Sequence, residues 1–247
     1  QQALPTPLYQ PPFRAPHHSA SATALVGGGS HPQPGEVSLA HRGVLFLDEL
    51  AEYPKHTLDL LREPLESGEI NIIRTRASAL FPAQFQLIAA TNPCPCGYAP
   101  SSRCQCGREQ IRRYRARLSG PLLDRIDLQV EVAALGAQEL TAGELANNKQ
   151  GPSSAVLRSE VVRCHKIQMA RQKKLNAQLN RAELEHFCPL EDDQRTLLGS
   201  AVERYNLSAR SYYRILRVMR TLADLRQAEH CSLDDLYEAL SLRMGEM

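Results

Sequence analysis

Apolar residues in the first half of the chain gather into short runs that predict strands. The clearest run, Val44–Leu47, is uninterrupted and leads directly into Asp48 and Glu49. A continuous run of this length is typical of a strand buried on both faces, as in a parallel sheet covered by helices. A second run at 85–91 predicts another buried strand, and residues 70–73 begin a third. The pattern therefore predicts an α/β fold with a parallel sheet.

The rest of the first half of the chain contains weaker signals for secondary structure. Residues 1–43 are rich in Pro, Gly, His and Ser and read as irregular structure before the first long strand. The other elements expected here are a helix over 58–66 that Gly68 stops, a hairpin tip at 74–78, a helix over 109–118 and a short strand over 128–132.

The pattern becomes helical after a change in composition. Residues 136–153 are rich in Gly and Asn and predict a linker. Helices are expected over 154–178, over 191–205, over 209–228 after an N-cap at Ser208, and from Ser232 onward. The sequence thus predicts an incomplete α/β core at 1–135, a linker at 136–153 and an all-α domain at 154–247.

Composition narrows the class of protein. The apolar fraction of 43% is ordinary, and the net charge of +2 is small. The chain has no apolar run of membrane-spanning length and no signal-peptide pattern, so we expect a cytoplasmic protein that does not enter a membrane. Seven cysteines argue against a secreted disulfide framework and favour reduced thiols.

The acid pair after the first long strand carries the main chemical signal. Parallel sheets bind ligands at the carboxyl ends of their strands. There, Asp48 can hold Mg²⁺ through water and Glu49 can polarise the water that attacks a phosphate, which is the Walker B arrangement of ATPases. Asn92, which follows the 85–91 strand, fits the sensor 1 role of positioning water. The alternatives are a structural strand end for the acids and a turn before Pro93 for Asn92.

A phosphate-binding loop is missing from the sequence. No Gly-x-x-x-x-Gly-Lys-Ser/Thr motif occurs, and the glycine-rich stretch at 27–30 lacks the lysine. The chain also begins at Gln1 rather than Met. We expect the phosphate loop upstream, and we expect this chain alone to hydrolyse ATP negligibly.

Two arginine positions are candidates for contacts with ATP. Arg125 lies between Asp124 and Asp127, and an arginine can stabilise phosphoryl charge in a neighbouring subunit's site. The alternative is a local ion pair with either acid. Arg210 begins a basic helix face that continues with Arg214 and Arg217, and its place in the first turn is unfavourable for the helix dipole. A γ-phosphate contact, the sensor 2 role, would explain that cost, whereas a solvated face is the alternative.

Four cysteines form a cluster with metal-ligand spacing. Cys94, Cys96, Cys104 and Cys106 can complete a tetrahedral Zn²⁺ site, although Cys-x-x-Cys is the commoner spacing. The alternative is four unligated loop cysteines. The other three, Cys164, Cys188 and Cys231, are isolated in the sequence and fit core or surface positions. His17 and His18 are adjacent and receive no metal role.

Basic residues also suggest contacts with nucleic acid. Arginines crowd the region 103–117, where they can meet phosphates, although a solvated helix face explains them too. Arg74 and Arg76 belong to the predicted hairpin tip, and a tip that carries two arginines can project into the pore of a ring.

Together these segments resemble the magnesium-chelatase-like AAA+ ATPases of the ComM type (competence, YifB-like). The resemblance is carried by PFRAPHHSAS at 12–21, PGEVSLAH at 34–41, GVLFLDEL at 43–50, NPCPCG at 92–97, SGPLLDRID at 119–127 and LSARSYYR at 207–214. It implies an incomplete AAA+ core of the helix-2-insert group, which also contains the MCM helicases, followed by a helical lid.

The resemblance also implies roles and partners. It assigns the Walker B acids to Asp48 and Glu49, sensor 1 to Asn92, the trans arginine to Arg125 and sensor 2 to Arg210. Arg74 falls where MCM proteins place a DNA-contacting lysine. The implied cofactors are ATP and Mg²⁺, and the implied partners are further copies in a hexameric ring and branched or single-stranded DNA, with DNA branch migration during natural transformation as the activity.

Two other functions stay open at this point. One is a chelatase-type motor subunit that remodels a partner inserting Mg²⁺ into a porphyrin, since the nucleotide machinery is shared. The other is a DNA-binding or oligomerisation module without catalysis, for which DNA binding would depend steeply on salt and not on nucleotide.

Overall fold

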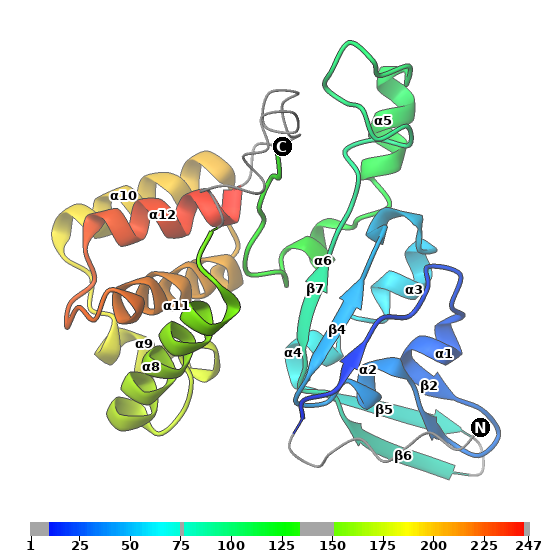
Figure 1. Cartoon of the computed structure of the whole chain (residues 1–247), viewed down its shortest axis with the longest axis horizontal. Helices are drawn as coiled ribbons and strands as arrows, with labels where there is room; N and C mark the ends of the chain where they lie inside the picture. The colour runs from blue at the N-terminus through cyan, green and yellow to red at the C-terminus, as the bar shows by residue number, and fades with distance from the viewer. Residues whose placement is uncertain (1–9, 75–76, 134–150, 245–247) are drawn as a thin grey trace. The chain divides into compact units, whose positions relative to one another are not determined.

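A computed structural model describes residues 10–74, 77–133 and 151–244 (Figure 1). The chain divides into two compact units, residues 1–126 and 127–247. The predicted linker at 136–153 lies almost entirely outside the described residues, so the predicted domain limits stay predictions. Each unit has a hydrophobic core of its own.

A parallel three-stranded sheet forms the centre of the first unit. Strands β1 (Phe13–Arg14), β4 (Val44–Leu47) and β7 (Gln86–Ala89) lie in the order β1-β4-β7, with Leu47 opposite Ala89. Leu45 and Leu47 are completely buried. The predicted α/β fold with a parallel sheet is confirmed, and β4 and β7 lie where the apolar runs indicate. The predicted burial of the second strand was wrong, because three of the four residues of β7 are exposed.

Strand β1 approaches β4 unusually closely at Gly43. A Cβ on Gly43 would lie 1.9 Å from the carbonyl oxygen of Pro12. The next amide, that of Val44, donates a 2.8 Å hydrogen bond to the same oxygen. A residue without a side chain is therefore required where the two strands begin to pair.

The segment before β4 is more regular than expected. It contains helix α1 (Ala22–Val26), the two-stranded β2 (Gly27–Gly28) and β3 (Gln33–Pro34), and helix α2 (Glu36–Leu39). The prediction of irregular structure here was wrong. These elements are too short to produce a helical or strand period, and they are held by burial of side chains such as Leu25 and Val37, both completely buried.

The helix predicted over 58–66 is broken into separate pieces. After the 3₁₀ helix η1 (Leu50–Glu52) come α3 (Lys55–Asp59) and α4 (Pro64–Ser67). Pro64 lacks an amide hydrogen and occupies the first turn of α4, so the leucine spacing alone does not continue one helix through it. The predicted stop is correct, because Gly68 caps α4 with a φ of 73°.

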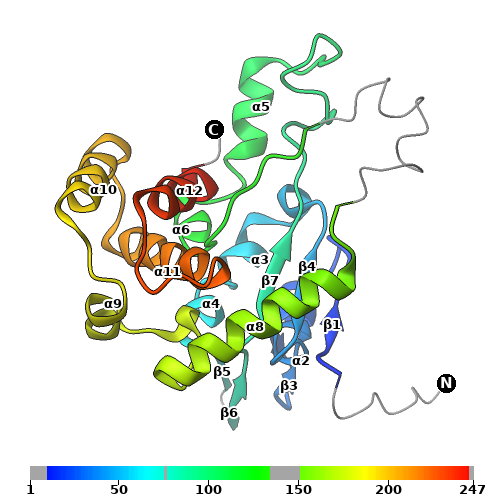
Figure 2. The same ribbon diagram turned by 60° about the vertical axis from the view of Figure 1, so that its left-hand side comes forward.

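The predicted hairpin is present at the edge of the first unit. Strands β5 (Glu69–Arg74) and β6 (Ala77–Pro82) pair antiparallel, with Arg74 opposite Ala77. Beyond β7 the chain forms helix α5 (Arg108–Arg115), close to its predicted place, and then α6 (Gly120–Leu123). The hairpin and α5 lie at opposite ends of this unit (Figures 1 and 2).

No strand forms over the described residues 128–132, so that prediction was wrong. The amide of Gln129 donates to the carbonyl of Leu242 at 2.6 Å, while Val130 and Val132 are 68% and 89% exposed. The apolar residues therefore have neither a strand to pair with nor a core to cover them.

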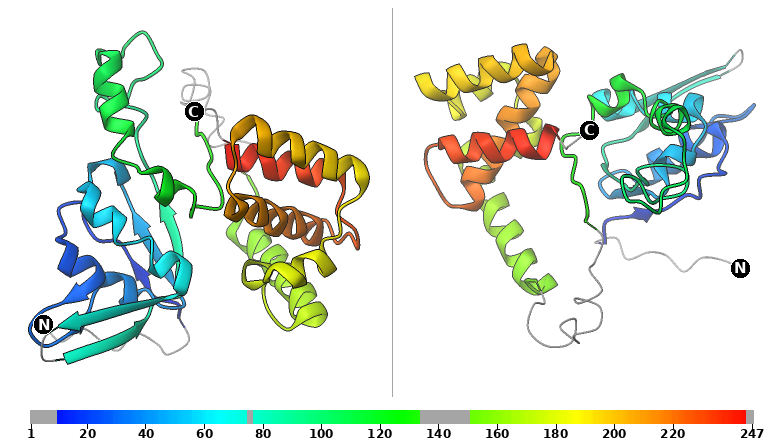
Figure 3. Two further views of the ribbon diagram at one scale, coloured as in Figure 1. Left: turned by 180° about the vertical axis from the view of Figure 1, so that it is seen from behind. Right: turned by 90° about the horizontal axis from the view of Figure 1, so that it is seen from above.

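The second unit is helical, as predicted (Figure 3). Its elements are α8 (Ser154–Gln172), the 3₁₀ helix η2 (Asn176–Gln178), α9 (Arg181–Phe187), α10 (Asp192–Tyr205), α11 (Ala209–Leu225) and α12 (Leu233–Met244). Leu198, Met219 and Leu236 are completely buried between them. Together the units form a partial AAA+-type α/β core and an α-helical lid.

Polar caps fix the ends of the lid helices. The hydroxyl oxygen of Ser208 accepts from the amide of Ser211 at 3.1 Å, as predicted. Ser232 and Asp235 cap α12 reciprocally, because each side chain accepts from the other residue's amide, at 3.2 and 2.8 Å. None of the helices in the described part of the chain combines the length and apolar character needed to span a membrane.

Candidate nucleotide edge and cysteine cluster

The carboxyl ends of β4 and β7 form one polar edge. The amide of Leu50 donates to the carbonyl of Ala90 at 2.8 Å, so the segments that follow β4 and β7 leave the sheet side by side. Asp48 and Glu49 follow β4 and are both exposed, and Asn92 follows β7 and is also exposed. The sheet therefore brings three of the predicted site residues to the same edge.

Glu49 adopts a backbone conformation that non-glycine residues rarely use. Its φ of 49° lies in the left-handed region. Its amide donates to the Asp48 carboxylate at 2.9 Å, and this local contact helps to hold the turn. Such strain concentrates at functional positions, because the surrounding structure must compensate for it.

His18 contacts the acid pair and was not predicted as a site residue. Its Nδ1 lies 2.9 Å from Oε2 of Glu49. Beside it, the hydroxyl of Tyr53 donates to the carbonyl of Pro16 at 2.6 Å, and burial together with the charge of Asp48 raises the pKa of Tyr53 to about 12. The only sequence signal was a histidine pair soon after a strand that was itself too short to predict.

The end of helix α5 is tied back to this edge by Arg117 and Tyr114, which lie in the arginine-rich region that the sequence analysis considered for phosphate contacts. Arg117 donates to the carbonyl of Ala51 at 2.9 Å and to the carboxylate of Glu52 at 3.0 Å. Tyr114 is buried, and burial followed by the charge of Glu52 raises its pKa. The segment after Asn92 is thus anchored at its far end to the residues that follow the acid pair.

Arg125 forms an ion pair within its own unit. Its guanidinium donates to Oε2 of Glu66 at 2.5 Å and to the carbonyl of Pro121 at 2.8 Å, and its side chain is 14% exposed. The expected alternative was a local pair with Asp124 or Asp127. Arg125 pairs with Glu66, which is 59 residues away in sequence, and Asp127 pairs with Arg214.

The arginine face of α11 is engaged by the lid rather than solvated. Arg214 pairs with Asp127, and Arg217 donates twice to the carbonyl of Leu179, at 3.1 and 2.8 Å. Burial, and then the neighbouring Arg214, lower the pKa of Arg217. Arg210 lies in the first turn after Ser208 and is half-buried.

The four clustered cysteines converge between β7 and α5. Their sulfur atoms all lie within 4.8 Å of one another, and Cys94 is completely buried. Backbone amides of Tyr98 and Gln105 donate to Cys96 and lower the pKa of its thiol to about 6. Of the cysteines outside the cluster, all are buried, and Cys188 and Cys231 have their sulfurs 3.5 Å apart in the lid core, which their separation in sequence did not indicate.

The basic residues expected to meet DNA are only partly described. Arg74 ends β5, while Arg76 lies outside the described residues. On α5 the side chains of Arg112 and Arg113 are both 78% exposed, and both pair with Glu109. Exposed arginines also occur at Arg103, Arg108, Arg115 and Arg117.

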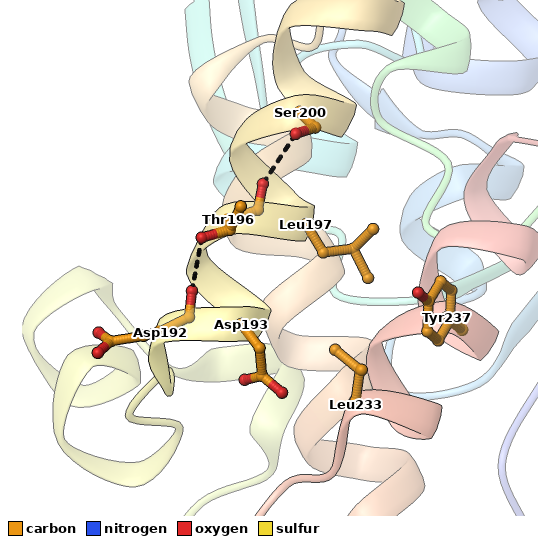
Figure 4. A pocket seen from close by; sticks show the side chains of 7 residues that line it. All are labelled: Asp192, Asp193, Thr196, Leu197, Ser200, Leu233 and Tyr237. Atoms are coloured by element: carbon orange, nitrogen blue, oxygen red, sulfur yellow. Dashed lines mark hydrogen bonds between the residues drawn. The ribbon is translucent and has the colours of Figure 1, made fainter.

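A shallow hollow on the lid surface contains none of the predicted site residues. It has a volume of about 540 Å³ between α10 and α12 and is lined by Asp192, Asp193, Thr196, Leu197, Ser200, Leu233 and Tyr237 (Figure 4). The hydroxyls of Thr196 and Ser200 donate hydrogen bonds to backbone carbonyls one turn earlier in α10, at 2.8 and 3.0 Å. The hollow therefore offers mainly two acids and apolar surface.

Comparison with known proteins gives consistent results along the chain. Residues 1–140 match the family described as magnesium chelatase, subunit ChlI, and residues 151–243 match the C-terminal family of the same subunit. The competence protein ComM of Haemophilus influenzae is 50% identical over 95% of this chain and 45% of its own length. The YifB protein of Salmonella typhimurium is 48% identical over 95% of this chain and 46% of its own length.

A third relative matches over a shorter region. The magnesium-chelatase 38 kDa subunit of Acidiphilium rubrum is 40% identical over 70 residues, which are 28% of this chain and 20% of that protein. The chain thus spans about half the length of the long relatives that it matches.

Proposed function

The chain belongs to the magnesium chelatase ChlI family and is a ComM-type member of it, and from this premise we propose that it forms part of an ATP-driven AAA+ motor that acts on DNA. The observation that carries the ATPase part is the shared edge of β4 and β7, which gathers Asp48, Glu49 and Asn92. The DNA part is supported by 50% identity to a protein named for competence.

The residues of this edge fit Mg²⁺ and ATP chemically. Exposed carboxylates at the end of a buried strand are the oxygen ligands that Mg²⁺ prefers. Asp48 would hold the ion through water, and the ion would neutralise charge on the phosphates. Glu49 would polarise the attacking water, and the side-chain amide of Asn92 would orient that water. The phosphate loop would come from outside this sequence.

Two arginines are proposed to complete the site from other elements. Arg125 would reach the site of a neighbouring subunit, and Arg210 would contact the γ-phosphate from the lid. The proposed assembly is a hexameric ring in the intact protein, because an arginine supplied in trans requires a neighbour. We further propose that Cys94, Cys96, Cys104 and Cys106 hold a structural Zn²⁺.

The proposed substrate is branched or single-stranded DNA, reached through the β5–β6 hairpin. Arg74 ends β5, Arg76 follows two residues later in the sequence, and arginines bind phosphates strongly. A motor that works on incoming DNA in natural transformation would act in the cytoplasm. A role in DNA branch migration is part of the proposal because of the similarity to a competence protein.

ATP hydrolysis tests the proposal most directly. The chain would be joined to a segment carrying a Gly-x-x-x-x-Gly-Lys-Ser/Thr loop and assayed with and without branched DNA. We expect DNA to stimulate hydrolysis, Glu49→Gln to abolish it, and Glu203→Gln, at an exposed lid position, to leave it unchanged. Arg74→Ala should remove the stimulation alone, whereas Arg158→Ala, also in the lid, should retain it.

The alternatives have different outcomes in the same assay. Hydrolysis that depends on Glu49 but ignores DNA would support a chelatase-type remodelling motor and refute the DNA motor. DNA binding that falls steeply with salt, without any hydrolysis, would leave a binding or oligomerisation module.

A further inference from the structure

The loop between β7 and α5 contains a cluster of four thiols with the spacing of a single-ion site. The sulfurs of Cys94 and Cys96 are 3.3 Å apart, those of Cys96 and Cys104 are 3.6 Å apart, and those of Cys94 and Cys104 are 3.8 Å apart. Cys106 completes the group within 4.8 Å. Zn–S bonds of about 2.3 Å in a tetrahedron place sulfurs about 3.8 Å apart.

Backbone amides surround these sulfurs in the manner of a metal-binding turn. The amide of Ala99 donates to the sulfur of Cys94 at 3.3 Å. Gly97 makes the turn possible, since its φ is 79° and its amide donates to the carbonyl of Cys94 at 3.0 Å. Amide hydrogen bonds of this kind stabilise thiolates and orient them, as partners of metal ligands do.

The loop has little else to hold it. Among residues 93–107 only Cys94 is buried, and Tyr98 is 53% exposed. Apolar burial therefore contributes little to its order, whereas a small segment without a core can be held by a metal ion. An iron–sulfur cluster fits less well, because its irons and sulfides would push four thiolates further apart than this group allows.

We propose that Cys94, Cys96, Cys104 and Cys106 bind one Zn²⁺ as thiolates and that this ion fixes the path of the chain from Asn92 to α5. Cys94 lies two residues after Asn92, and Cys106 directly precedes Gly107, the N-cap of α5. The ion would thereby hold the sensor position at one end of the loop and the arginine-bearing helix at the other. This inference rests on the zinc site of the proposed function and extends it to a structural role. Zinc binding does not depend on ATP hydrolysis, so it can fail or succeed independently of the proposed DNA motor.

Metal analysis of the purified 247-residue chain tests the site. We expect one equivalent of zinc per chain in the wild type and in Cys164→Ser, whose buried thiol lies in the lid and serves as the matched control. Cys96→Ser should lose the zinc. Wild-type chain that carries no zinc after expression with added zinc, and takes up none in a titration, would overturn the proposal, as would iron in place of zinc.

Two further measurements do not depend on whether the variant folds. Wild-type chain stripped with a chelator and given Co²⁺ should show the visible absorption bands of a tetrahedral tetrathiolate, and a spectrum of an octahedral oxygen-bound ion would refute the ligand set. Stripping should also increase hydrogen exchange several-fold in residues 93–107 and leave α10–α12 unchanged. Unaltered exchange in the loop would refute the bracing role.

Discussion

Asp224 offers the sharpest test of how the lid is stabilised. Its carboxylate is 1% exposed and accepts from Arg171 at 2.6 and 2.8 Å, from Asn176 at 2.8 Å and from Arg220 at 3.2 and 2.9 Å. These donors come from α8, η2 and α11. One buried anion thus joins three elements of the lid, and Asp224→Asn removes its charge at nearly unchanged volume.

The size of the effect follows from what the substitution leaves behind. Breaking a buried ion pair by removing one partner costs about 3–5 kcal/mol, because the remaining charge is buried without compensation. The side chain of Arg220 is 2% exposed, but that of Arg171 is 24% exposed and can recover some hydration. We therefore expect the lid to lose about 3 kcal/mol of unfolding free energy, the lower end of the range.

Denaturant unfolding of the intact chain, followed by circular dichroism and by hydrogen exchange in lid peptides, measures this loss. Asp234→Asn is the matched control, since Asp234 is exposed in the first turn of α12 and should cost only a few tenths of a kcal/mol. A loss below about 1 kcal/mol for Asp224→Asn would refute the reasoning, because that is the value of a surface pair.

The pH dependence of the same variant provides an independent check. Burial by itself raises the pKa of Asp224, but the hydrogen bonds from Arg171 and Asn176 lower it more, so its pKa lies below the usual 3.8. A carboxyl with a lowered pKa stabilises the fold above its unfolded-state pKa and loses that contribution as the pH falls through the folded-state pKa. The difference between wild type and Asp224→Asn should be constant near neutral pH and shrink below about pH 4.

Two further predictions concern the first unit. Gly43→Ala should destabilise this unit by about 1–3 kcal/mol in denaturant unfolding, since the new methyl group meets the Pro12 carbonyl. The control is Gly199→Ala, in open space within α10, which should stabilise the lid by about 0.5–1 kcal/mol. Equal effects of the two substitutions would contradict the close approach of β1 and β4. His18→Gln in the chain joined to a phosphate loop should lower kcat about tenfold at unchanged KM for ATP, because Glu49 loses a contact that orients it, and exposed His230→Gln should change neither. An unchanged kcat for His18→Gln would make that contact structural only.

The sequence predicted those parts of the fold whose stabilisation is local. An uninterrupted apolar run marks β4, because a strand in the middle of a parallel sheet needs apolar residues along its whole length. The caps at Ser208 and Ser232 could be located because a capping side chain bonds within its own turn. The elements before β4 escaped prediction, since two-residue strands and a five-residue helix show no period and depend on distant contacts such as the Val44–Pro12 hydrogen bond.

The site residues also fall into those with a local sequence signal and those without one. Asp48, Glu49 and Asn92 could be proposed because strand ends in a parallel sheet converge, and the cysteines could be proposed because their spacing is itself the signal. The contact of His18 with Glu49 and that of Arg117 with Ala51 join segments 31 and 66 residues apart. No pattern along the sequence specifies which distant residues make contact, so these contacts could be identified only from the three-dimensional structure.

The ion pair of Arg125 with Glu66 remains compatible with a role in a neighbouring subunit. The carboxylate of Glu66 is 47% exposed, so solvent screens this partner of the pair, although the side chain of Arg125 is only 14% exposed. A phosphate group with more than one negative charge offers a guanidinium stronger, bidentate hydrogen bonds than a single exposed carboxylate does. The pair therefore holds Arg125 in a defined place, and in the proposed role a γ-phosphate would compete with Glu66 for its guanidinium.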